Sequence, residues 1–122
     1  MSLAEPITLL VGMVGLVLVH EAGHAGAAQA LRLPWRPTLS RRGPGVRIGS
    51  ESFRLTRGQV IPTAAAGPLV SLAFGIAIWQ SHPLLALASF EMTLLNLVLP
   101  HSDGATIVRV LCGRDYSRNS GA

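Results

Sequence analysis

Three apolar stretches, each long enough to cross a lipid bilayer, limit what this chain can fold into. They cover residues 6–31, 60–80 and 83–99, and a helix needs about 20 residues to span the hydrocarbon core. Only 13% of the 122 residues are charged, about half the proportion in an average soluble domain. We therefore predict one all-α membrane domain with three transmembrane helices and room for a short fourth helix in the C-terminal segment, residues 100–122.

A polar connector, residues 32–59, separates the first two apolar stretches. Residues 46–48 and 52–55 alternate between apolar and polar side chains, which is typical of strands. We expect a small β-hairpin with its turn near Gly49 and Ser50.

The basic residues are all arginines, and their positions favour a role in membrane topology over nucleic acid binding. Seven of the ten lie between residues 32 and 57 and the others are Arg109, Arg114 and Arg118, whereas the link 80–83 has none. Because positive charges accumulate on the cytoplasmic side, we expect the N-terminus outside and the C-terminus in the cytoplasm. The absence of lysine points to a GC-rich genome and hence to a bacterial cell membrane.

The segment HEAGH, residues 20–24, places ionisable groups inside the first apolar stretch. On a helix, His20 and His24 point to the same side and Glu21 lies beside them. In this H-E-x-x-H arrangement two histidines hold zinc and the glutamate acts as general base. A pair of hydrogen-bonded packing histidines is the alternative, but ionisable residues inside a span are costly and usually functional. The single cysteine, Cys112, excludes a cysteine-based metal cluster.

A catalytic zinc ion takes a third protein ligand and keeps one position open for water. The candidates are His82, Glu91, His101 and Asp103. At about 1.5 Å per helical residue, His24 lies about 27 Å from the outer end of the first span. Asp103 lies at about 28 Å along the third span, but Glu91 at only about 10 Å. Depth therefore favours Asp103, with His101 as the rival, and leaves His82 in the outer link.

Three segments of the chain, taken in order, resemble the motifs of the site-2 protease family of intramembrane zinc metalloproteases. They are HEAGHAGAAQAL from residue 20, AAAGPLVSLAFG from residue 64 and NLVLPHSDGATIVRVL from residue 96. The resemblance implies that the zinc ligands are His20, His24 and Asp103. It also implies that Glu21 is the catalytic base and that Asn96 contacts the substrate.

The function we expect is hydrolysis of a peptide bond in or near a transmembrane segment of a membrane protein, with Glu21 activating zinc-bound water. An inactive zinc-binding relative that acts as a regulator or scaffold is the alternative, and the intact Glu21 argues against it.

An edge strand within residues 44–56 is expected to bind the unwound substrate. We interpret Gly67 and Pro68 as residues that let the second helix lie close to the first, with a direct contact to the substrate as the alternative. Self-association or a membrane partner is also expected, because a three-helix core leaves little surface for gating.

Overall fold

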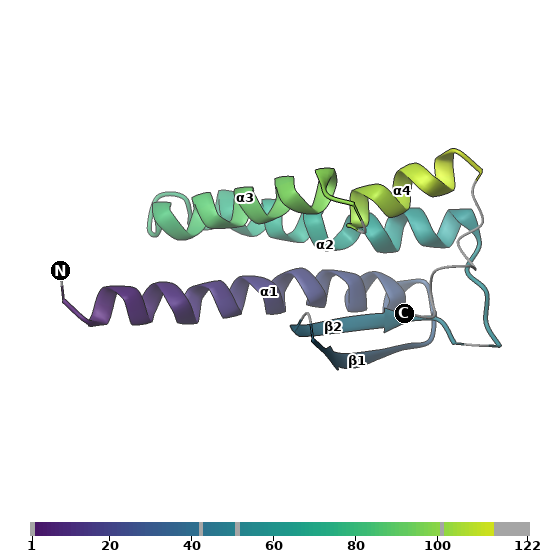
Figure 1. The fold of residues 1–122 in the computed structure, drawn as a ribbon, viewed down its shortest axis with the longest axis horizontal. Coiled ribbons are helices and arrows are strands. Elements are labelled where there is room, and N and C mark those ends of the chain that lie inside the picture. The colour runs from purple at the N-terminus through teal and green to yellow at the C-terminus, as the bar shows by residue number, and fades with distance from the viewer. Residues whose placement is uncertain (1, 42, 51, 101, 114–122) are drawn as a thin grey trace.

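The computed structural model describes residues 2–41, 43–50, 52–100 and 102–113. Within them the chain forms α1 (Ala4–Ala30), β1 (Trp35–Ser40), β2 (Gly43–Ile48), α2 (Arg57–Ile78), α3 (Pro83–Val98) and α4 (Asp103–Leu111). The helix α2 lies beside α1, α3 and α4 follow one another along α2, and the hairpin lies against the C-terminal half of α1 (Figure 1). A mostly helical fold with a small two-stranded antiparallel sheet in the connector is therefore confirmed.

Three segments of the described chain are long and apolar enough to cross a membrane. They are Ala4–Ala30, Arg57–Ile78 and Pro83–Leu111, the last of which joins α3 and α4. Only 17% of the most apolar part of α1 is buried inside the protein, and large side chains such as Leu10 and Val14 are exposed. An outward apolar surface of this extent is typical of helices that contact lipid.

The sheet lies earlier in the connector than the sequence pattern predicts. The strand β2 contains the expected residues 46–48, but its partner β1 precedes it, and the connection runs from Ser40 to Gly43. A turn at Gly49 and Ser50 between two strands was therefore the wrong prediction, and residues 52–55 contribute only a single bridge at Phe53. Prolines in both strands weaken the strand pattern in the sequence. In a two-stranded sheet each strand has a free edge, where a proline costs no hydrogen bond.

The hydrogen-bond pattern of the hairpin determines which backbone groups remain free. The Gly49 N–H donates to Pro34 O over 2.7 Å, next to the last pair of the ladder. Because bonded and non-bonded pairs alternate in an antiparallel ladder, residues 43, 45 and 47 of β2 bond to β1. The backbone N–H and C=O groups of Val46 and Ile48 consequently point to the free edge of β2.

The hairpin also has two chemically different faces, because opposed residues share a face. One face is apolar and consists of Trp35, Pro37, Leu39, Pro44, Val46 and Ile48. The other face is polar or bare and consists of Arg36, Thr38, Ser40, Gly43, Gly45 and Arg47. A Cβ atom added at Gly45 would lie 3.8 Å from Glu21 Oε2. The polar face is therefore turned toward α1.

A Schellman motif ends α1 and reverses the chain. The Leu33 N–H donates to Ala28 O over 2.8 Å, and the Arg32 N–H donates to Gln29 O over 3.1 Å. Arg32 has a φ of 55°, in the left-handed region where glycine is the usual residue. Leu33 is buried directly after this turn. The reversal sends β1 back along α1 and so brings the hairpin over the C-terminal half of that helix.

Candidate metal centre

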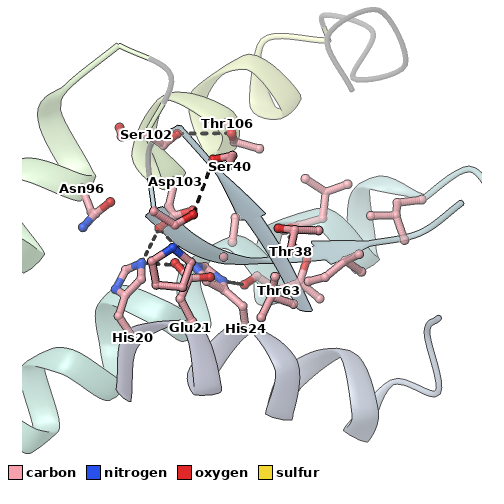
Figure 2. A pocket seen from close by; sticks show the side chains of 18 residues that line it. His20, Glu21, His24, Thr38, Ser40, Thr63, Asn96, Ser102, Asp103 and Thr106 are labelled. Carbon is pink, nitrogen blue, oxygen red and sulfur yellow. Dashed lines mark hydrogen bonds and ion pairs between the residues drawn. The ribbon is translucent and has the colours of Figure 1, made fainter. Parts of the chain in front are cut away.

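The helix α1 directs two histidines and a glutamate toward the other elements. His20 and His24 lie one turn apart and are 6% and 8% exposed, and Glu21 is half-buried beside them (Figure 2). One ligand atom from each of the three residues lies within 4.8 Å of the other two. Three groups of this chemistry at this spacing can hold a metal ion.

A carboxylate from the start of α4 joins the two imidazoles. Asp103 Oδ2 lies 3.1 Å from His20 Nε2 and 3.3 Å from His24 Nε2, and the two nitrogens are 3.2 Å apart. Bonds of about 2.0–2.1 Å in a tetrahedron would separate neighbouring zinc ligands by about 3.3–3.4 Å. The three atoms thus form a triangle close in size to one face of a zinc tetrahedron. Two imidazoles with one carboxylate also match the donor set of a catalytic zinc site.

The outer nitrogens of both imidazoles are held by α2. His24 Nδ1 donates to the backbone oxygen of Thr63 over 2.7 Å, which leaves Nε2 of the neutral ring with its lone pair. His20 Nδ1 lies 3.2 Å from the hydroxyl of Ser71. Partners on the outer nitrogen fix the tautomer and orientation of a metal-binding histidine. Both rings therefore have the support that such a ligand requires.

Two glycines let α1 and α2 come close enough for these contacts. A Cβ atom at Gly67 would meet His24 Nε2 and would lie 2.6 Å from His24 Cε1 and 2.9 Å from His20 Cε1. On the other helix, a Cβ atom at Gly23 would lie 2.7 Å from the backbone oxygen of Ala66. Real side chains do not approach so closely, and both positions therefore require glycine.

A break between α3 and α4 brings Asp103 to the histidines. The chain is extended at Leu99, and α4 begins at Asp103 after the N-cap residue Ser102, whose Oγ accepts from Ala105 N over 3.4 Å. A Cβ atom at Gly104 would meet the backbone oxygen of Leu97 and would lie 2.6 Å from its Cα. The first turn of α4 can therefore press against the last turn of α3, which fixes the position of Asp103.

A cavity of about 520 Å³ opens in front of the three converging atoms. Its walls come from all four helices and the hairpin, and hydroxyl groups line it at Thr38, Ser40, Ser102 and Thr106 (Figure 2). The backbone of β2 at Gly45 lies next to the carboxylate of Glu21. The cavity is large enough for water and for a short extended peptide segment, and its hydroxyl groups suit both.

Of the other candidate residues that the sequence offered, one lines the cavity and two are exposed on or next to α3. Asn96 lines the cavity and its amide donates to Met92 O over 2.9 Å. Glu91 is exposed on α3, and His82 is exposed at the start of α3, at the end of that helix far from α4. His101, the rival third ligand, lies outside the described residues.

Two supporting groups were not found from the sequence, the hydroxyl of Ser71 and the backbone oxygen of Thr63. A backbone oxygen carries no sequence signal at all. Ser71 had one weak signal, because it follows Gly67 by one helical turn and so lies on the side of α2 that approaches the histidines.

No protein-family model, curated protein or solved structure matches this chain. The assignment of the cluster therefore rests on its own geometry and on the motifs in the sequence.

Proposed function

We propose that the chain is an intramembrane zinc metalloprotease of the site-2 protease type. The observation that carries the proposal is the triangle formed by His20 Nε2, His24 Nε2 and Asp103 Oδ2, with edges of 3.1–3.3 Å and with Glu21 beside it. Zinc in such a site acts as a Lewis acid and makes hydroxide available near neutral pH. We assign His20, His24 and Asp103 as its protein ligands.

Glu21 is the general base in this proposal. Its carboxylate faces the cavity and lies within 4.8 Å of the histidine nitrogens, close enough to accept a proton from the attacking water. The same carboxylate then passes the proton to the leaving amine. Asn96 lies on the wall of the same cavity, where its carboxamide can hydrogen-bond a backbone group of the substrate.

A bilayer is the environment we propose for the protein. Its three long apolar segments suit transmembrane helices, and the hydroxyl-lined cavity offers water a path to the cluster. Arginines of the connector would lie at the cytoplasmic surface, with the N-terminus outside. Alkaline carbonate extraction of bacterial membranes checks this: an integral protein stays in the membrane pellet, and a peripheral one is released.

We propose that the free edge of β2 binds the unwound substrate as an added strand. Val46 and Ile48 both line the cavity, and both can offer a backbone N–H and C=O to an extended peptide. Val46→Pro removes the free N–H at this edge, and Leu39→Pro is the matched control at the outer edge of β1. We expect Val46→Pro alone to abolish cleavage, with zinc retained in both variants. Full cleavage by Val46→Pro would contradict strand addition and leave the metal site unaffected.

The metal content of the purified protein is the first test. We expect about one zinc per chain in the wild type and in Glu21→Gln, and a loss of zinc in His24→Ala and Asp103→Ala. The matched controls are His82→Ala and Glu91→Gln, which remove the same chemical groups from exposed positions of α3 and its cap. A wild type that never retains zinc refutes the proposal. If Asp103→Ala retains its zinc, Asp103 is not the third ligand.

Catalysis is tested in proteoliposomes with a panel of fluorogenic transmembrane peptides. We expect the zinc-loaded wild type to cleave at least one peptide, and Glu21→Gln to be slower by about 10²–10⁴-fold because it lacks the base. Equal rates for the two proteins would contradict the role of Glu21. A zinc-loaded wild type that cleaves no peptide of the panel favours the inactive, zinc-binding regulator.

A further inference from the structure

Ser71 on α2 is a completely buried polar residue that contacts the metal cluster without belonging to it. Its side chain is 0% exposed, and its Oγ lies 3.2 Å from His20 Nδ1. The hydroxyl of Ser89, on α3, donates to the backbone oxygen of the same residue over 2.6 Å. Ser71 is therefore bonded to α1 through its side chain and to α3 through its backbone.

The chemistry of an imidazole ligand defines what Ser71 can do. A neutral imidazole has one proton, and a ring that binds a metal through Nε2 must carry that proton on Nδ1. The Nδ1–H group of His20 is buried and needs an acceptor, because an unpaired buried donor costs about 1–3 kcal/mol. Ser71 Oγ is at hydrogen-bond distance and can accept a hydrogen bond from this group.

The two histidines differ in how this acceptor is provided. His24 donates to the backbone oxygen of Thr63, which is present whatever the side chain at that position. His20 depends on a side chain, and alanine in place of Ser71 would remove the acceptor. The acceptor available to His20 Nδ1 therefore depends on the residue at position 71.

We infer that Ser71 is a positioning residue for the metal ligand His20. Its hydroxyl oxygen accepts a hydrogen bond from Nδ1–H, keeps the Nε2 lone pair directed at the space shared with Asp103 Oδ2 and His24 Nε2, and so raises the metal affinity of the cluster. The inference rests on the proposed metal site and extends it to a residue that binds no metal.

The test compares Ser71→Ala with Ser89→Ala. Both substitutions remove one hydroxyl from a completely buried serine at the contact of α2 with a neighbouring helix. Only the first removes the acceptor of His20, whereas the second removes a donor to a backbone oxygen. Zinc affinity is measured by competition with a chromogenic chelator in detergent, and the visible spectrum of the Co²⁺-loaded protein reports the ligand geometry.

We expect Ser71→Ala to bind zinc about 10–100-fold more weakly than the wild type, the usual effect of losing such a partner. Its Co²⁺ spectrum should differ from that of the wild type, while Ser89→Ala should match the wild type in both measurements. Equal losses in both variants would show that helix packing is responsible, and unchanged affinity in Ser71→Ala would overturn the inference. A wild type without zinc would instead refute the proposed metal site itself.

A measurement on the unaltered protein covers the case in which Ser71→Ala does not fold. In ¹⁵N-histidine NMR spectra of the zinc-loaded protein, both ligand histidines should carry their proton on Nδ1. The Nδ1–H of His20 should exchange slowly with water, because its acceptor is buried. A His20 that binds metal through Nδ1, or whose Nδ1–H exchanges as fast as that of the exposed His82, would overturn the inference.

Discussion

Gly67→Ala is the smallest change that should disrupt the cluster of His20, His24 and Asp103. The added Cβ atom would lie 2.6 Å from His24 Cε1 and 2.9 Å from His20 Cε1, and carbon atoms pack at about 3.5–4.0 Å. The two helices must therefore separate by roughly 1 Å, or both imidazoles must rotate. Overpacking of this kind costs about 1–3 kcal/mol of stability. It also opens a triangle whose edges are only 3.1–3.3 Å.

We expect Gly67→Ala to lower zinc affinity by about 10²-fold or more, because both imidazoles lose their position together and each displaced ligand partner costs about 10–100-fold. Gly26→Ala is the matched control: it adds the same methyl group to α1, where no atom lies within 4 Å of the new Cβ. Chelator competition gives the affinity, and thermal unfolding with and without zinc gives the stability. Wild-type zinc affinity in Gly67→Ala would refute the reasoning, since the contact distances leave no space for a methyl group.

Substitutions at three further positions test how other elements position the site. Gly104→Ala should weaken zinc binding by about 10–100-fold, because the new Cβ would collide with the backbone of Leu97 and shift the start of α4. Equilibrium dialysis measures the zinc affinity, and an unchanged Kd would count against the role of that contact. Gly45→Ala should preserve cleavage, because its Cβ would lie 3.8 Å from Glu21 Oε2, whereas Gly45→Leu should slow cleavage by at least about 10-fold with zinc retained. A fully active Gly45→Leu would mean that substrate does not pass between β2 and Glu21. Arg32→Gly should stabilise the protein by about 1 kcal/mol, because it relieves a left-handed residue in the Schellman motif; a lower Tm would contradict this.

The helices could be predicted from the sequence because their length and apolarity are local properties. The hairpin could be predicted only in part. A strand at residues 46–48 is visible as alternation, but its partner contains Pro37, and a proline usually argues against a strand. Only the register places Pro37 and Pro44 at outward positions where no ladder bond is needed. Pairing of this kind depends on two segments together and is not visible in either one.

The approach of Asp103 to the histidines is a similar case. Counting residues along a straight helix places Asp103 near the depth of His24, and the structure brings its Oδ2 within 3.3 Å of that histidine. The direction of the carboxylate, however, depends on the break before α4 and on the contact of Gly104 with Leu97. A count of residues along a helix includes neither the break nor the contact. The sequence could therefore rank the candidate third ligands by their depth along the span, but it could not predict where their side chains point.

The helix α2 supplies none of the proposed ligands, yet it contacts both histidines of the cluster. Thr63, Gly67 and Ser71 follow one another at four-residue intervals on α2, so they lie on one side of that helix. They present in turn a backbone acceptor for His24, an empty space for both rings and a hydroxyl for His20. An H-E-x-x-H sequence on α1 alone would leave both outer nitrogens without partners and their rings free to turn. We therefore expect the metal affinity of the chain to depend on Gly67 and Ser71 as well as on the ligands themselves.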